Sequence, residues 1–165
     1  MTDLTLRDAT PDDAASICAI WNPIIRDTVI TFNPVERSPA EIAAMIRDRQ
    51  GAGHAFLLAQ SGAQVLGFAS YAQFRGGLGY ARCMEHTINL QDAARGQGAG
   101  RALLLALEDH ARRAGNHVMV GAVTASNVAS VAFHAALGYA TVGTMPQVGW
   151  KFGQFHDLVL MQKIL

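Results

Sequence analysis

Apolar and polar residues alternate with different periods along the chain, and these changes predict its secondary structure. Leu4-Thr-Leu-Arg-Asp8 alternates as a strand does. Thr10-Pro-Asp-Asp13 then supplies a cap, a proline at the first helical position and acids in the first turn, so we expect a helix from about Pro11 to Trp21. Ser38-Pro-Ala-Glu41 has the spacing of a capping box. It predicts a second helix, after an irregular segment from Asn22 to Arg37.

The middle of the chain has a period of two. His54–Gln60 and Gln64–Gln73 flank a turn at Ser61-Gly62, which is typical of a β-hairpin. Met84–Gln91 follows as another strand, after the glycine-rich stretch Gly76-Gly-Leu-Gly79. We therefore expect three consecutive strands here.

The last third of the chain alternates between helical and strand patterns. Gly98–Ala114 has one apolar stripe at helical spacing, and Gly115 is placed as a stop signal. The elements expected after it are a strand at His117–Val123, a helix at Ser126–Leu137 closed by Gly138, and strands at Tyr139–Gly143 and His156–Ile164. The order β-α-α-β-β-β-α-β-α-β-β predicts a mixed α/β sheet with helices on both faces.

Composition narrows the class of protein. The chain has 165 residues, of which 50% are hydrophobic and 16% charged, so one compact domain spanning residues 1–165 is expected and disorder is excluded. Basic and acidic side chains balance at 13 each. A balanced charge disfavours the large basic surface that nucleic acids require, but it leaves room for a small anionic ligand.

The cysteines and the charge pattern bear on compartment and metal binding. Cys18 and Cys83 are too far apart in sequence for a zinc motif and form no disulfide framework, so we expect no metal and a reducing cytoplasm. The first eight residues carry charges where a signal peptide would need an apolar run. Two stretches without charged residues, Gly51–Phe74 and Val118–Trp150, are interrupted by polar residues and glycines. They favour buried strands over membrane spans.

The sharpest motif is Arg95-Gly-Gln-Gly-Ala-Gly-Arg101, between a predicted strand and a predicted helix. Successive glycines let backbone amides converge, and the helix N-terminus adds unpaired donors, so this turn can hold a pyrophosphate. A dinucleotide fingerprint would need glycine in place of Arg101, and a P-loop would need Gly-Lys-Ser/Thr. The alternative is a glycine-rich helix entry without a ligand.

The motif Arg-Gly-x-Gly-x-Gly after a fourth strand resembles the acetyl-CoA loop of the GCN5-related N-acetyltransferase (GNAT) superfamily. Further segments resemble its phosphinothricin and methionine sulfoximine acetyltransferases: Glu85-His86, Ser126-Asn-Val-Ala-Ser130, His134-x-x-Leu-Gly-Tyr139, Met145-Pro-Gln-Val-Gly149 and Gly149-Trp-Lys-Phe-Gly-Gln-Phe-His-Asp157. The resemblance covers nearly the whole chain. It implies a mostly antiparallel mixed sheet whose two central parallel strands splay apart around acetyl-CoA.

The resemblance also implies a set of cofactor contacts and a homodimer. The pantetheine arm would pair with the strand backbone, the pyrophosphate would lie in the glycine-rich turn, and the following helix would contact the arm. The implied residues are Ile88, Asn89, Leu90, Arg95, Gly96, Gln97, Gly98, Ala99, Gly100, Arg101, Asn127 and Ser130.

Acetyl transfer to an amine needs a base for the amine and a proton for the departing thiolate. Glu85 resembles the family's catalytic glutamate, and we assign it as general base, directly or through a water; the alternative is a carboxylate paired with Arg75 or Arg82.

His134 is assigned as general acid or proton shuttle, since imidazole titrates near neutral pH; the alternative is a packing residue. Cys83 could be a nucleophile in a double-displacement mechanism, but a buried thiol is favoured. His86 alternates to the face opposite Glu85 and is expected to support the site without reacting.

For the acceptor, a guanidinium can hold an amino-acid carboxylate in a bidentate pair, and Arg75 and Arg82 flank the loop before Glu85. Phe32 resembles a family pocket aromatic. The sequence therefore predicts an acetyl-CoA-dependent N-acetyltransferase for the α-amine of methionine sulfone, methionine sulfoximine, phosphinothricin or a similar amino acid. The alternatives are another small amine, a peptide N-terminus, or a non-catalytic acyl-CoA-binding module.

Overall fold

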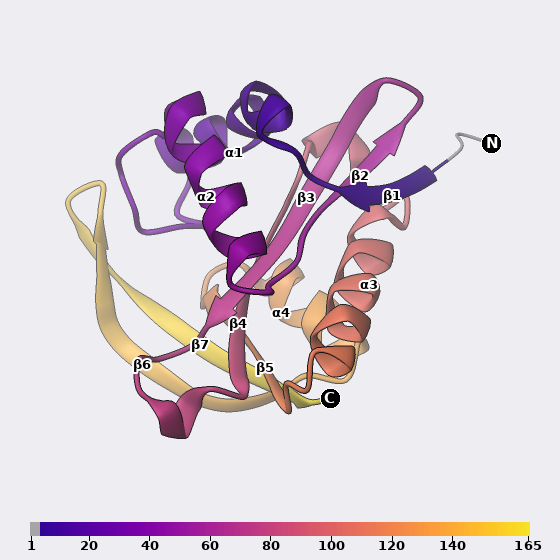
Figure 1. The fold of residues 1–165 in the computed structure, drawn as a ribbon. Helices are drawn as coiled ribbons and strands as arrows, with labels where there is room; N and C mark the ends of the chain where they lie inside the picture. Colours follow the sequence, from indigo (N-terminus) through magenta and orange to yellow (C-terminus); the bar gives the residue numbers. More distant parts are fainter. Residues whose placement is uncertain (1–3) are drawn as a thin grey trace.

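A seven-stranded mixed sheet runs through the computed structural model, which describes residues 4–165 (Figure 1). The strands lie in the order β1-β2-β3-β4-β5-β7-β6, and only β4 and β5 are parallel neighbours. Their bounds are β1 Leu4–Asp8, β2 Phe56–Ser61, β3 Gln64–Gln73, β4 Cys83–Leu90, β5 Val118–Thr124, β6 Ala140–Lys151 and β7 Gln154–Ile164. The predicted fold class is confirmed.

Helices cover both faces of the sheet (Figure 1). The four helices are α1 (Ala14–Asp27), α2 (Pro39–Gly51), α3 (Ala99–Arg113) and α4 (Val128–Ala136); three single 3₁₀ turns are η1 (Pro11–Asp13), η2 (Leu78–Tyr80) and η3 (Asp92–Ala94). Helices α1 and α2 bury Ile17 and Ile42 against Phe68 on one face. On the other face, α3 buries Leu103 against Tyr71. No helix within residues 4–165 is long and apolar enough to cross a membrane.

Helix α1 is longer than the sequence pattern predicts. It continues through Pro23 to Asp27, so the predicted irregular segment begins six residues later than expected. A proline inside a helix removes one backbone hydrogen bond. Here Ile24 and Ile25 are buried along with the earlier apolar residues of the helix, and this burial outweighs the lost bond.

Strand β6 is also longer than predicted. It runs from Ala140 to Lys151, whereas the sequence pattern indicated a strand ending at Gly143. Two register shifts interrupt its pairing with β7, and Gln147, within the second of them, has a positive φ of 57°. Such bulges hide the period of two on which strand prediction depends. The remaining predicted elements agree with the structure to within two residues.

The parallel strands β4 and β5 pair over only three residues. Their register runs from Cys83–Val118 to Glu85–Val120, and then the strands separate. From His86 to Leu90, β4 pairs only with β3. An unpaired strand edge offers backbone donors and acceptors to an extended ligand. The N-terminal ends of α3 and α4 follow these two strands along the chain, so the opening lies between them.

Candidate active site

Two adjoining cavities lie at the separation of β4 and β5. The first, here called the central cavity, is lined by Trp21, Ile30, Thr31, Phe32, Glu85, His86, Thr87, Ile88, Asn89, Ala122, Val123, Thr124, Asn127, Ser130, His134 and Leu158. The second, here called the loop cavity, is lined by Ile30, Ile88, Asn89, Leu90, Arg95, Gly96, Gly98, Gly100, Arg101, Asn127, Ala129, Ser130 and Phe133. Five residues line both, so the two cavities lie side by side.

The loop cavity is shaped by the glycine-rich turn before α3. Gly96 and Gly98 have φ values of 74° and 87°, a region that other residues rarely adopt. Gly98 is the N-cap of α3, so the amides of the first turn have no partner within the helix. A Cβ at Gly100 would lie 3.1 Å from Cδ1 of Leu90, a tight contact, so the glycine eases the close approach of the helix to β4. The turn can therefore present converging amides to an anion.

Most of the predicted cofactor residues line the loop cavity. They are Ile88, Asn89, Leu90, Arg95, Gly96, Gly98, Gly100, Arg101, Asn127 and Ser130. Gln97 and Ala99 are not among its lining residues. The Gln97 side chain donates to the carbonyl oxygen of Ala93 (2.6 Å), and Ala99, the first residue of α3, is buried.

Asn127 fixes the start of α4 beside both cavities. Its Oδ1 accepts a hydrogen bond from the amide of Ser130 (3.2 Å), which is the geometry of a helix N-cap. This capping role uses only the oxygen of the amide group. The Nδ2 donors are therefore available for a ligand in the cavities.

Glu85 reaches the central cavity from the sheet face covered by α1 and α2. Its side chain is half-buried and forms no ion pair with Arg75 or Arg82 in the structure. Burial raises the pKa of this carboxyl group, and the positive charge of Arg49 opposes the rise. A carboxylate whose pKa is raised, and which lies in a cavity, is suited to accept the proton that an amine loses.

Arg49 is a component of the site that the sequence analysis missed. Its Nη1 donates to the hydroxyl of Ser70 (3.1 Å), on the same sheet face as Glu85. The signal was present in the spacing of α2, because Ile42, Ile46 and Arg49 follow one another at helical intervals. The two isoleucines are fully buried against the sheet, and the same stripe carries the guanidinium toward it.

His134 reaches the central cavity from the opposite face and stacks on His86. The two rings lie 5.0 Å apart at an angle of 11°, and their Nε2 atoms are 3.1 Å apart. Gly121 on β5 makes room for them, since a Cβ there would lie 3.1 Å from Nε2 of His86. His86 thus lies on the face opposite Glu85, as the alternation of β4 predicts.

The partners of the two rings define their protonation. His134 Nδ1 lies 2.7 Å from the carbonyl oxygen of Ser130, so it carries the hydrogen and donates. His134 Nε2 then accepts from Nε2–H of His86, which leaves Nδ1 of His86 buried without a partner among the described residues. Burial lowers the pKa of both rings, that of His86 to about 3. Both imidazoles are therefore neutral at neutral pH.

Cys83 does not line either cavity. Its side chain is half-buried, and burial raises the pKa of the thiol, with a further contribution from the charge of Glu85. A thiol with a raised pKa is a poor nucleophile. The geometry therefore favours direct transfer over a mechanism through Cys83.

The three predicted acceptor residues lie in different places. Phe32 lines the central cavity and stacks on His156, with ring centroids 5.8 Å apart. Arg75 and Arg82 are exposed and line neither cavity within this one chain. The Arg75 guanidinium instead lies 5.6 Å above the ring of Tyr80.

Comparison with known proteins places this site in a family. The Acetyltransferase (GNAT) family matches residues 21–139. The chain is 40% identical to the L-methionine sulfoximine/L-methionine sulfone acetyltransferase of Pseudomonas aeruginosa, over 96% of this chain and 92% of the relative.

Solved structures agree with this assignment. An acetyltransferase from Salmonella typhimurium with its cofactor acetyl-CoA is 36% identical, with a TM-score of 0.95 over 99% of this chain and 94% of that one. A phosphinothricin acetyltransferase from Sinorhizobium meliloti in complex with acetyl-CoA is 33% identical, with a TM-score of 0.94 over 100% and 89% of the two chains. The protein therefore belongs to the GNAT acetyltransferase family and is similar over nearly its whole length to methionine sulfoximine and phosphinothricin acetyltransferases.

Proposed function

We propose that the protein transfers the acetyl group of acetyl-CoA to the α-amine of a small amino acid of the methionine sulfoximine, methionine sulfone or phosphinothricin type. One observation carries the proposal: the cavity that holds Glu85 adjoins the cavity formed by the glycine-rich turn and shares five lining residues with it. A thioester held between them would face a carboxylate whose pKa is raised by burial. The named activities of the relatives from Pseudomonas aeruginosa and Sinorhizobium meliloti support this substrate class.

The residues of the loop cavity fit acetyl-CoA. Amides of the turn from Gly96 to Gly100 would hold the pyrophosphate, with Arg95 and Arg101 adding charge. The β4 backbone from His86 to Leu90 lacks a β5 partner and would pair with the pantetheine arm. When bound, acetyl-CoA supplies an activated acyl group.

The transfer requires one bond to form and one to break. The neutral amine nitrogen attacks the thioester carbonyl carbon, the C–N bond forms, and the C–S bond breaks with its electron pair on sulfur. Glu85 accepts the proton that the amine loses. The departing sulfur is then the thiolate of CoA, which takes up one proton to become the free thiol.

His134 is the proposed source of the proton for sulfur. Its Nδ1–H is held by the Ser130 carbonyl and its Nε2 by His86, so donation requires Nδ1–H to leave the carbonyl. Because the ring is neutral, it would act as a shuttle, and its other nitrogen would take up a proton from solvent as Nδ1–H passes to sulfur. If His134 only holds α4 in place, His134→Asn will raise the KM for acetyl-CoA. If it donates the proton, the same variant will lower kcat and leave the KM for acetyl-CoA nearly unchanged.

Phe32, Arg75 and Arg82 are the proposed acceptor contacts. Phe32 would form the wall for the side chain of the amino acid, and the two arginines would serve its carboxylate. Arg75 and Arg82 line no cavity of the single chain. The resemblance to the family separately predicts a homodimer. Sedimentation equilibrium of the wild-type protein tests the dimer, and a monomer at all concentrations would contradict it. The cytoplasm stays the predicted compartment.

The test is release of free thiol from acetyl-CoA with a panel of amino acids, other small amines and peptides, with product identification by mass spectrometry. The proposal expects N-acetylation of at least one of the sulfoximine, sulfone or phosphinothricin substrates. Glu85→Gln should lower kcat by about 10²-fold or more, while the exposed Asp48→Asn control keeps wild-type activity. Absence of turnover on every amino acid would contradict the proposed substrate, and product from peptides alone would favour the alternative.

A further inference from the structure

The segment Thr28–Phe32, here called the wall loop, follows α1 and forms one side of the central cavity. Ile30, Thr31 and Phe32 all line that cavity, and Ile30 also lines the loop cavity. The segment has no helical or strand structure. Its carbonyl groups therefore need hydrogen-bond donors from elsewhere in the chain.

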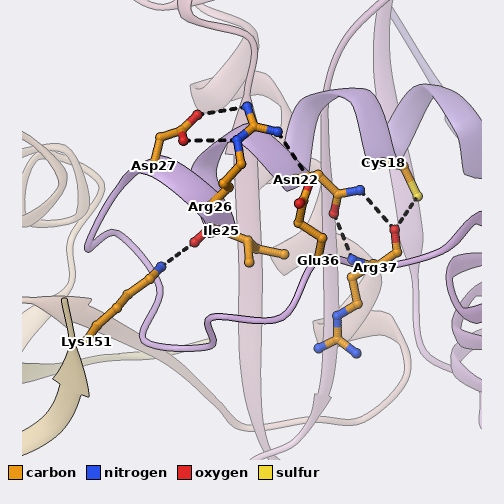
Figure 2. Close-up of polar contacts among 8 residues, drawn as sticks. All are labelled: Cys18, Asn22, Ile25, Arg26, Asp27, Glu36, Arg37 and Lys151. Carbon is orange, nitrogen blue, oxygen red and sulfur yellow. Dashed lines mark hydrogen bonds and ion pairs between the residues drawn. The ribbon is translucent and has the colours of Figure 1, made fainter. Parts of the chain in front are cut away.

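Lys151 supplies these donors from the end of β6. Its side chain is only 3% exposed. The ammonium donates to the carbonyl oxygens of Ile25 (2.5 Å), Thr28 (2.6 Å) and Thr31 (2.8 Å), and Figure 2 shows the side chain reaching across to Ile25. An ammonium group has three hydrogens, so all of its donors are used.

The charge of Lys151 is compensated by the backbone. Within residues 4–165 no carboxylate forms an ion pair with it. The Ile25 carbonyl belongs to the last turn of α1, where the helix dipole is negative. The neighbouring Arg26 instead pairs with Asp27 and Glu36 at the surface (Figure 2). Among these cations, Lys151 alone is buried and holds the loop.

Other residues from the C-terminal half contact the same loop. Thr124 on β5 donates from its hydroxyl to the carbonyl of Val29 (2.5 Å). Gly149, two residues before Lys151, lies directly against the Phe32 ring, where a Cβ would overlap it. The imidazole of His156 stacks on the Phe32 ring itself, with the ring centroids 5.8 Å apart. The shape of the wall loop thus depends on the β6–β7 hairpin, which is far away in sequence.

We propose that Lys151 is the positioning residue for the acceptor: its three hydrogen bonds fix the wall loop and thereby the side of the central cavity that binds the amino acid. The assignment of that cavity to the acceptor rests on the proposed function. Lys151 lines neither cavity and touches no reacting atom, so its effect passes through the loop. The loop cavity shares only Ile30 with this segment, so acetyl-CoA binding is expected to depend on Lys151 much less.

The kinetic test compares Lys151→Met with Lys163→Met. Lys163 is also a partly buried cation, but it pairs with Glu108 on the opposite face (2.6 Å). Lys151→Met should raise the KM for the acceptor by about tenfold or more and leave the KM for acetyl-CoA within about twofold. Lys163→Met should lower stability without changing the ratio of the two KM values. An unchanged acceptor KM, or an equal rise in both, would overturn the proposal.

A second readout does not need activity. In hydrogen exchange, Lys151→Met should speed exchange of the amides of the wall loop and leave those of α3 unchanged. If the protein acetylates no amino acid, the proposed function fails, and this measurement still decides whether Lys151 fixes the loop. Should Lys151→Met not fold, Lys151→Arg keeps the charge but cannot direct three donors from one atom. It should show the same pattern of KM values and exchange, and wild-type behaviour of Lys151→Arg would overturn the proposal.

Discussion

The Nε2 atoms of His86 and His134 lie 3.1 Å apart, and this contact joins β4 to α4 on the sheet face opposite Glu85. The carboxylate and the histidine pair nevertheless line one cavity. Side chains from two faces of a sheet can meet only where neighbouring strands separate, which β4 and β5 do directly after Glu85. The short parallel pairing is therefore what brings the two sets of titratable groups together.

The histidine pair makes stability depend on pH. An unfolded imidazole titrates near pH ~6.5, whereas burial lowers the pKa of His86 to about 3. Between these values the unfolded state binds a proton that the folded state does not, so the free energy of unfolding falls as pH falls. The loss is absent above the unfolded pKa and reaches on the order of a few kcal/mol near pH ~4.5. Urea denaturation across this range measures it.

His86→Gln should flatten this dependence, because glutamine does not titrate and can still donate to His134. The exposed His117→Gln should keep the wild-type slope. The comparison stays above about pH 4.5, because Asp13 also makes stability depend on pH below that value. Arg7 lowers the pKa of Asp13 to about 2, so the contribution of Asp13 to the free energy of unfolding is lost as the pH falls below its ordinary pKa of 3.8. Equal slopes for His86→Gln and wild type would show that the buried pair does not titrate on unfolding.

Gly121→Ala tests how tightly the pair is packed. A Cβ at this position would lie 3.1 Å from Nε2 of His86 and 3.2 Å from Cδ2 of His134. We expect a loss of about 1–3 kcal/mol in the free energy of unfolding, because overpacking forces the rings apart. Gly143→Ala is the control, since a Cβ there meets no atom within 4 Å. Equal stability of the two variants would mean that the rings adjust freely.

Arg49 should control the acid side of the activity profile. Its charge lowers the pKa of Glu85 against the effect of burial, so Arg49→Met should raise that pKa further. Because the base must be ionised to work, the acid limb of kcat should move to higher pH by roughly one unit. The exposed Arg47→Met keeps the helix and serves as control. A limb that stays in place would assign it to a group other than Glu85.

The sequence predicts those parts of the site that depend on contiguous residues better than it predicts the ends of α1 and β6. The glycine-rich turn and its helix are predictable because Gly96, Gly98 and the stripe of α3 are contiguous in sequence. The course of α1 beyond Trp21 is not, because Pro23 is a breaker by itself and only the tertiary burial of Ile25 outweighs it. Bulges likewise hide the full length of β6.

The sequence also does not predict the roles of residues whose partners lie far away along the chain. In the sequence, Lys151 cannot be told from a surface lysine. Only the fold brings its ammonium group to three carbonyl oxygens of a distant segment. His86 could be placed on its face by alternation, but its contact with His134 depends on the position of α4 and on the missing side chain of Gly121. Arg49 could have been found from the spacing of α2, whereas Lys151 had no local signal.

Gly149→Ala should alter acceptor binding through Phe32. A Cβ at Gly149 would overlap the Phe32 ring, which lines the central cavity and stacks on His156. The ring must then move, and a moved wall should raise the KM for the acceptor by about tenfold while the KM for acetyl-CoA changes little. Gly79→Ala is the control, since a Cβ there meets nothing within 4 Å and the residue lines neither cavity. Phe32→Leu in the Gly149→Ala background removes the overlap, so it should restore stability without restoring acceptor affinity. Wild-type acceptor KM in folded Gly149→Ala would show that Phe32 does not contact the amino acid.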